Sequence, residues 1–271
     1  MTHPFFDLPS PLVIGHRGAA GERPENTLPS FARALEQGAG VLETDVHVSR
    51  DGHVVISHDP DVARTTDGRG DVADLDLEAL RALDAGYRFS PDGGRSHPFR
   101  GRGLRIPTLR EAFEAFPEAR FNIEIKRADP RLVDGTLDAV EAGGRAGRTL
   151  LAAGDDEAMA RLRARLRERA LPVAMGASTA DVVGFVRAAR GEAEPPPEPM
   201  ALQIPPDFGG RPLVTRELVD FAHARGVQVH VWTVNEPDAM HALLDLGVDG
   251  IVSDWPGRLR KVVDARRRGG G

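Results

Sequence analysis

The segment "VLETDVHVSRDGHVVISH" (residues 41–58) contains two strand-like runs separated by a turn. Val and Ile alternate with polar residues in both runs, and "SRDG" between them is typical of a β-hairpin. No helical pattern lies between the runs, so we predict that they pair antiparallel. Folding this hairpin would bring Glu43 and Asp45 beside His58 at one end of a sheet.

Outward from this segment, Val- and Ile-rich runs alternate with amphipathic helical patterns over the whole chain. Such alternation predicts a parallel α/β fold, and eight or more strands favour a TIM-type (β/α)8 barrel over an open sheet. One of the two hairpin strands should therefore run against the others or lie outside the barrel. The nine strand candidates are residues 12–16, 41–48, 53–58, 121–126, 149–154, 172–178, 200–205, 227–234 and 250–254.

The pattern shows no domain boundary, so we expect one barrel domain over residues 1–271. Residues 60–106 form a long insertion after the third strand candidate, and insertions of this length usually act as lids or small caps. The tail at about 264–271, "DARRRGGG", is expected to be frayed or disordered.

Composition narrows the class of protein. The net charge is -6 and the arginines are scattered, so a nucleic-acid partner is not expected. No apolar run approaches the roughly 20 residues of a membrane span, and the N-terminus lacks the features of a signal peptide. We therefore expect a cytoplasmic protein without stable membrane insertion. Its partner should be a small-molecule substrate.

Polar residues cluster where strands end, which is the functional face of such a barrel. Glu43 and Asp45 are two apart and share one strand face, and alternation turns Glu124 inward between Ile123 and Ile125. The strand-end residues are His16, Arg17, His58, Asp59, Glu124, Lys126, Trp232, Asn235, Ser253 and Asp254.

Burying three carboxylates is costly unless a cation compensates their charge. Oxygen ligands without cysteine indicate one hard divalent cation, Mg²⁺ or Ca²⁺, held by Glu43, Asp45 and Glu124. The alternative is that Glu124 pairs with Lys126 or Arg17 and no metal binds.

Two histidines at one barrel mouth suit general acid–base catalysis, so His16 and His58 are the catalytic candidates. Arg17 and Lys126 supply fixed positive charge for a phosphate group, and the whole set indicates phosphoryl chemistry. Trp232 is either a wall of the substrate site or a core residue.

These residues lie in motifs that resemble the glycerophosphodiester phosphodiesterase family of phospholipase-C-like phosphodiesterase barrels. The resemblance implies hydrolysis of glycerophosphodiesters to an alcohol and glycerol 3-phosphate, as part of lipid or glycerol metabolism. It implies catalytic roles for His16 and His58, metal binding by Glu43, Asp45 and Glu124, and phosphate binding by Arg17 and Lys126. The motifs are "GHRG", "PENT", "LETDVHVSRDGHVVISHD", "RTTDGRG", "IPTLREAF", "NIEIK", "VWTVN" and "GVDGIVSDWP", in the family's order over nearly the whole chain.

Two enzyme alternatives are a lysophospholipase D and a sphingomyelinase-D-like or phosphoinositide-cleaving phosphodiesterase, which would need an apolar track at the mouth. A non-enzymatic alternative is a barrel that only binds phosphate-bearing ligands. Such a protein would be expected to lack His16, His58 or one of the carboxylates, and all are present.

Overall fold

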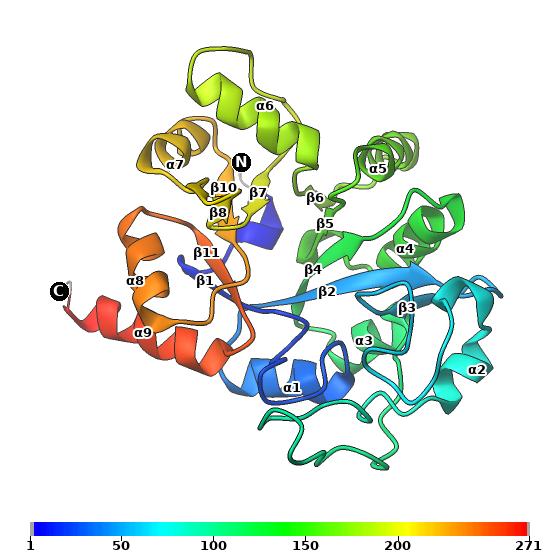
Figure 1. Cartoon of the computed structure of the whole chain (residues 1–271). Helices are drawn as coiled ribbons and strands as arrows, with labels where there is room; N and C mark the ends of the chain where they lie inside the picture. The colour runs from blue at the N-terminus through cyan, green and yellow to red at the C-terminus, as the bar shows by residue number, and fades with distance from the viewer. Residues whose placement is uncertain (1–2, 270–271) are drawn as a thin grey trace.

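Eight parallel strands form the centre of the structure, a computed structural model that describes residues 3–269 (Figure 1). In the sheet they follow the order β6-β5-β4-β2-β1-β11-β10-β7. The N–H of Met200, just before β7, donates to the carbonyl of Met175 in β6 at 2.9 Å and brings the two end strands together. The strands are β1 (Leu12–Gly15), β2 (Val41–Val48), β4 (Arg120–Ile125), β5 (Thr149–Ala152), β6 (Ala174–Met175), β7 (Ala201–Ile204), β10 (Gln228–Val231) and β11 (Gly250–Ser253).

The predicted hairpin is confirmed and accounts for the ninth strand candidate. Strand β3 (Val54–Ile56) pairs antiparallel with β2, with Val46 opposite Ile56, and takes no place in the barrel itself. A second, small hairpin follows β7 and was not predicted; it consists of β8 (Asp207–Phe208) and β9 (Arg211–Pro212).

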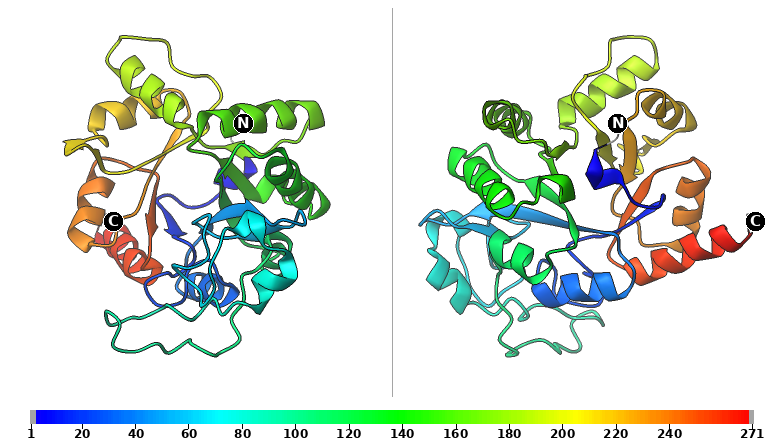
Figure 2. Two further views of the ribbon diagram at one scale, coloured as in Figure 1. Left: turned by 45° about the vertical axis from the view of Figure 1, so that its right-hand side comes forward. Right: turned by 180° about the vertical axis from the view of Figure 1, so that it is seen from behind.

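Helices surround the barrel because the outward residues of each strand are apolar (Figures 1 and 2). On β4, for example, Phe121, Ile123 and Ile125 are all buried in the layer between sheet and helices. Together with the TIM-type strand order, this arrangement confirms the predicted fold. The helices are α1 (Leu28–Glu36), α2 (Leu77–Ala82), α3 (Leu109–Ala115), α4 (Pro130–Ala142), α5 (Asp156–Arg169), α6 (Thr179–Ala189), α7 (Arg216–His223), α8 (Pro237–Asp245) and α9 (Pro256–Gly269).

The inside of the barrel is filled at its N-terminal end and hollow at the other. A short 3-10 helix, η1 (Pro4–Phe6), closes the N-terminal end, and its Phe5 is 1% exposed. The imidazole of His3 accepts a hydrogen bond from the Phe5 N–H and so caps this turn. Phe5 packs with the inward residues Leu12, Ile14, Val41, Leu150, Ala152, Ala174, Ala201 and Val252.

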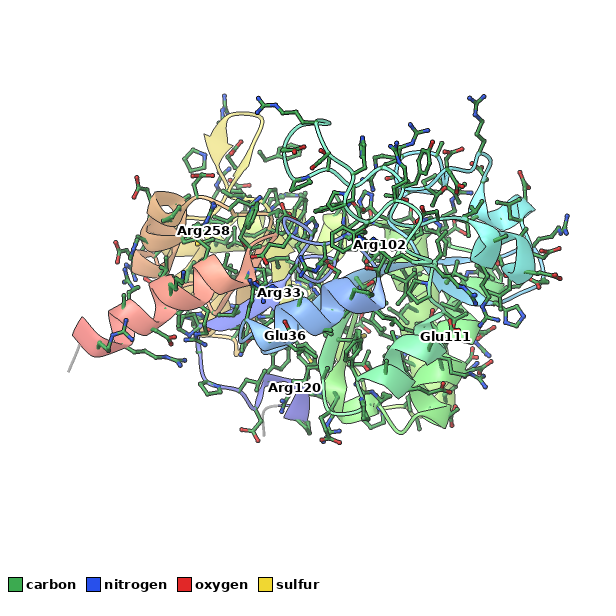
Figure 3. The ribbon with its side chains drawn as sticks, turned by 90° about the horizontal axis from the view of Figure 1, so that it is seen from below. Arg33, Glu36, Arg102, Glu111, Arg120 and Arg258 are labelled. Carbon is green, nitrogen blue, oxygen red and sulfur yellow. The ribbon has the colours of Figure 1, made fainter. Side chains whose placement is uncertain are left out.

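The insertion at residues 60–106 packs through a hydrophobic cluster of its own. Its members Val62, Val72 and Leu80 pack with Val55 of β3, so the insertion is anchored on the hairpin. A short 3-10 helix, η2 (Val72–Asp74), and α2 are its regular elements. In Figure 3 the insertion and the β8–β9 hairpin rise from the same end of the barrel, opposite η1.

The C-terminal tail differs from expectation. Helix α9 continues to Gly269, whereas the sequence suggested an irregular chain from about residue 264. The extension has partners, because Arg266 pairs with Asp245 at 2.5 Å and Arg267 donates to the carbonyl of Ser10. The remaining residues of the tail lie outside the described range. Within residues 3–269, no helix is long and apolar enough to cross a membrane.

Phe5 should be important for stability because it closes the barrel. We expect Phe5→Ala to lower the free energy of unfolding by about 3–5 kcal/mol, the cost of emptying a buried phenylalanine site. Phe208→Ala is the matched control, since Phe208 is 79% exposed, and its effect should stay within about 0.5 kcal/mol. Urea denaturation followed by circular dichroism measures both. Equal effects of the two substitutions would contradict this role of Phe5.

Candidate active site

A cavity of about 400 Å³ opens at the C-terminal end of the barrel. The sequence predicts the functional site at this end, because inward side chains of neighbouring parallel strands meet there. All eight predicted site residues line it: His16, Arg17, Glu43, Asp45, His58, Glu124, Lys126 and Trp232.

The loop after β1 holds His16 and Arg17 at the mouth. Arg17 has a left-handed backbone (φ 49°), and Gly18 follows at φ 90°. A Cβ on Gly18 would lie 2.4 Å from Ser30 Oγ, so only glycine fits against α1. The Ser30 hydroxyl in turn donates to the Arg17 carbonyl. The first turn of α1 therefore fixes this loop, and Thr27 caps α1 by accepting a hydrogen bond from the Ser30 N–H.

Asp45 is the most enclosed carboxylate of the site, with 1% of the residue exposed. One oxygen lies 2.9 Å from Lys126 Nζ. The other lies 3.5 Å from Arg17 Nε and accepts a hydrogen bond from the Asn26 amide at 3.2 Å. Lys126 also pairs with Glu124 at 2.8 Å and so bridges two strands. Burial lowers the pKa of Lys126, but Asp45 and Glu124 outweigh this effect and raise it overall.

The negative charge of Glu43 is compensated less than that of Asp45. It accepts a hydrogen bond from the Arg17 backbone N–H at 2.9 Å. Burial and the negative charge of Asp45 raise the pKa of Glu43 to about 7. His16 and Arg17 lower the pKa of Glu43 but do not outweigh burial and Asp45. A bound cation would supply the remaining positive charge.

The three predicted metal ligands line one cavity without forming a finished metal site. In residues 3–269, no group of three His, Asp or Glu side chains is arranged to hold a metal ion. The Lys126 ammonium lies between Asp45 and Glu124, where it balances their charge. The predicted Glu124–Lys126 pair is therefore present, and a cation bound by all three carboxylates would require Lys126 to shift.

His16 is oriented by a carboxylate. Its Nδ1 lies 2.6 Å from Asp254 Oδ1, which leaves Nε2 for the cavity, 4.0 Å from Glu43 Oε2. Asn235 holds Asp254 in place by donating to its other oxygen at 2.6 Å. Burial lowers the pKa of His16, but the hydrogen bond with Asp254 and the charge of Glu43 raise it above the ordinary value.

His58 has a similar partner at the other side of the mouth. Its Nδ1 lies 2.7 Å from Asp59 Oδ1, and Arg64 holds the second oxygen of Asp59. Arg64 also donates two hydrogen bonds to Glu25, at 2.6 and 2.7 Å. Glu25 in turn pairs with Arg17 at 2.8 Å, so it braces the loop and connects Arg17 to His58 through Arg64.

Sequence reasoning placed Asp59 and Asp254 at strand ends without giving them a role, and it missed Arg64. The position of Arg64 in "RTTDGRG", shortly after His58, was the available signal. Trp232 is 44% exposed and lines the cavity, so the core-packing alternative for it is wrong.

Known proteins are similar to this chain in sequence and in fold. Residues 16–258 match the Glycerophosphoryl diester phosphodiesterase family. The chain is 34% identical over 261 residues to a probable glycerophosphodiester phosphodiesterase 2 of Mycobacterium tuberculosis, covering 94% of this chain and 91% of that protein. It is 33% identical to a glycerophosphodiester phosphodiesterase of Caldanaerobacter subterraneus, covering 96% and 99%.

Among solved structures, an Oleispira antarctica phosphodiesterase in complex with the product sn-glycerol-3-phosphate has a TM-score of 0.75 and 26% identity. The match covers 94% of this chain and 97% of that one. The family match over residues 16–258 and these relatives, together with the barrel and its polar cavity, show that the chain belongs to the glycerophosphoryl diester phosphodiesterase family.

Proposed function

We propose that this protein hydrolyses glycerophosphodiesters to an alcohol and glycerol 3-phosphate by paired-histidine acid–base catalysis, assisted by one divalent cation. The observation that carries the proposal is the placement of His16 and His58. Both line one cavity, and each has a carboxylate within 2.7 Å of its Nδ1. The product complex of the Oleispira relative supports the same substrate class.

The two carboxylates define what each histidine can do. A carboxylate accepts a hydrogen bond from Nδ1–H, so Asp254 and Asp59 favour the tautomer with Nδ1–H and leave Nε2 to exchange a proton. One Nε2 removes the proton from the attacking hydroxyl, which belongs to water or to the glycerol 2-position. The other Nε2 protonates the leaving alcohol.

Arg17 and Lys126 support binding of the phosphate. Both are largely enclosed, with 15% and 16% of their side chains exposed, and neighbouring carboxylates keep them charged. Fixed cations in an enclosed site neutralise phosphate charge more strongly than cations in water do. Trp232, exposed at the mouth, is a wall for the alcohol part of the substrate.

The donor set fits Mg²⁺ or Ca²⁺, because Glu43, Asp45 and Glu124 offer carboxylate oxygens and Glu43 is only partly compensated by His16 and Arg17. When bound, such an ion would neutralise phosphate charge and polarise the phosphorus–oxygen bonds. An ion held by these carboxylates would replace Lys126 as the partner of Glu124, and the Lys126 ammonium would then be available to the phosphate.

The histidines should be essential for turnover. We expect His16→Ala and His58→Ala each to lower kcat on glycerophosphocholine by about 10²–10⁴-fold, the usual contribution of a general acid or base. His53→Ala is the matched control, because His53 lies in the exposed hairpin turn. Enzymatic assay of released glycerol 3-phosphate measures the rates, and circular dichroism confirms folding. Near-normal activity of either site variant would overturn its assignment.

Activity should also depend on a divalent cation. Removal of metal by EDTA, followed by dialysis, should lower the rate by at least about 10²-fold, because the phosphate then loses the charge neutralisation that the ion would supply. Added Mg²⁺ or Ca²⁺ should restore it, and the more effective ion identifies the preference. Unchanged activity after chelation would show that Lys126 alone compensates these carboxylates.

A further inference from the structure

The main chain of His58 is held by a second histidine. Nε2 of His47 lies 3.1 Å from the carbonyl oxygen of His58. A carbonyl oxygen only accepts, so Nε2 of His47 carries the hydrogen and donates it. His47 follows Asp45 by two residues on β2 and therefore lies on the same strand face. The residue is only 5% exposed, so little water competes for this hydrogen bond.

The contact lies where the pairing of the β2–β3 hairpin ends. The backbone hydrogen bond of the hairpin nearest to His58 runs from the Ser57 N–H to the Asp45 carbonyl at 3.0 Å. His58 follows directly and lies beyond the last residue of β3, Ile56. Its backbone therefore leaves the sheet at this point, and the His47 ring supplies a restraint that strand pairing no longer gives.

The ring of His58 is held through Asp59. Its Nδ1 lies 2.7 Å from Asp59 Oδ1, and Nε of Arg64 donates to Asp59 Oδ2. Burial raises the pKa of Asp59, but Arg64 and His58 outweigh this effect and lower it overall. Asp59 is therefore ionised at neutral pH and can accept the Nδ1–H of His58.

The Arg64 guanidinium has a carboxylate partner at each of its three nitrogens. Nε bonds to Asp59, whereas the two terminal nitrogens donate to Glu25 at 2.7 and 2.6 Å. Because a guanidinium is planar, these contacts fix its orientation as well as its position. Arg64 lies in a turn between Val62 and Thr66, which are 1% and 0% exposed. The Thr66 hydroxyl closes this turn by donating to the Val62 carbonyl at 2.8 Å.

We propose that His47 and Arg64 are positioning residues for His58. The proposal rests on the proposed function, in which Nε2 of His58 exchanges a proton. His47 fixes the main chain of His58, and Arg64 fixes its ring through Asp59. Neither is among the described residues that line the cavity, so both act through His58. A displacement of about 1 Å can cost about 10²-fold in rate, so both contacts should matter for turnover.

The two residues should differ in their kinetic effects, because Arg64 has a second partner. Glu25, which Arg64 also holds, pairs with Arg17 at 2.8 Å, and Arg17 is assigned to the phosphate. Loss of the His47 contact should therefore lower kcat and leave KM nearly unchanged. Loss of Arg64 should lower kcat and also raise KM.

Steady-state hydrolysis of glycerophosphocholine tests the role of His47. We expect His47→Leu to lower kcat by about 10–10²-fold, with KM within about twofold of the wild type. His47→Gln should restore most of kcat, because the amide nitrogen of Gln can donate to the same carbonyl. His230→Leu is the matched control, since His230 is a buried histidine, 1% exposed, that pairs with Gln228. Its kcat should equal that of the wild type.

The same assay tests Arg64. Arg64→Met should lower kcat by about 10–10²-fold and raise KM by at least about threefold, because both His58 and Arg17 lose a restraint. Arg50→Met is the matched control, since Arg50 donates to Asp76 on the exposed side of the hairpin. Both of its kinetic constants should stay within about twofold of the wild type.

A second set of variants tests whether the two residues act through His58. In a His58→Ala background, adding His47→Leu or Arg64→Met should leave kcat unchanged, because the group that they position is gone. A merely structural role would instead lower kcat in both backgrounds. Circular dichroism and Tm show that each variant is folded.

Three outcomes would overturn the proposal while His58→Ala is inactive: wild-type kcat in His47→Leu or Arg64→Met, a folded His47→Gln as slow as His47→Leu, or further losses in the His58→Ala background. Full activity of His58→Ala would overturn the proposed function and this assignment with it. The His58→Ala variant therefore distinguishes the two failures.

Discussion

The burial of two carboxylates side by side on β2 is the constraint on which the site depends. Glu43 and Asp45 face inward two residues apart, 9% and 1% exposed. Like charges at this separation in a poorly hydrated interior must be compensated or protonated. Asp45 is compensated by Lys126 and Arg17, whereas the pKa of Glu43 rises to about 7. The two buried carboxylates therefore account for the cationic side chains of the site and for the proposed metal ion.

The ion pairs that compensate these carboxylates also connect distant parts of the chain. Arg17 pairs with Asp45 and with Glu25. Glu25 also pairs with Arg64 of the insertion. Arg64 then holds Asp59, the partner of His58. The insertion therefore contributes to the position of an acid–base group, and its own hydrophobic cluster packs it against Val55 of β3.

Much of this could be predicted from the sequence, because local patterns determine it. Period-two alternation predicted which side chains of β2 and β4 face inward, and the turn "SRDG" predicted the hairpin. The Arg64–Glu25 contact spans 39 residues and depends on the path of two irregular loops, which no periodic pattern encodes. Helix α9 continues into the tail that was expected to be frayed, because its arginines find partners in α8 and the N-terminal segment.

The central claim is that Glu43, Asp45 and Glu124 together hold one divalent cation. Equilibrium dialysis of metal-free protein against Mg²⁺ or Ca²⁺, with metal analysis of both compartments, measures it directly. We predict one ion per chain for the wild type, and a Kd at least about tenfold weaker when Glu43 or Glu124 is replaced by Gln. A wild type that binds no ion, or variants that bind as tightly as the wild type, would contradict it.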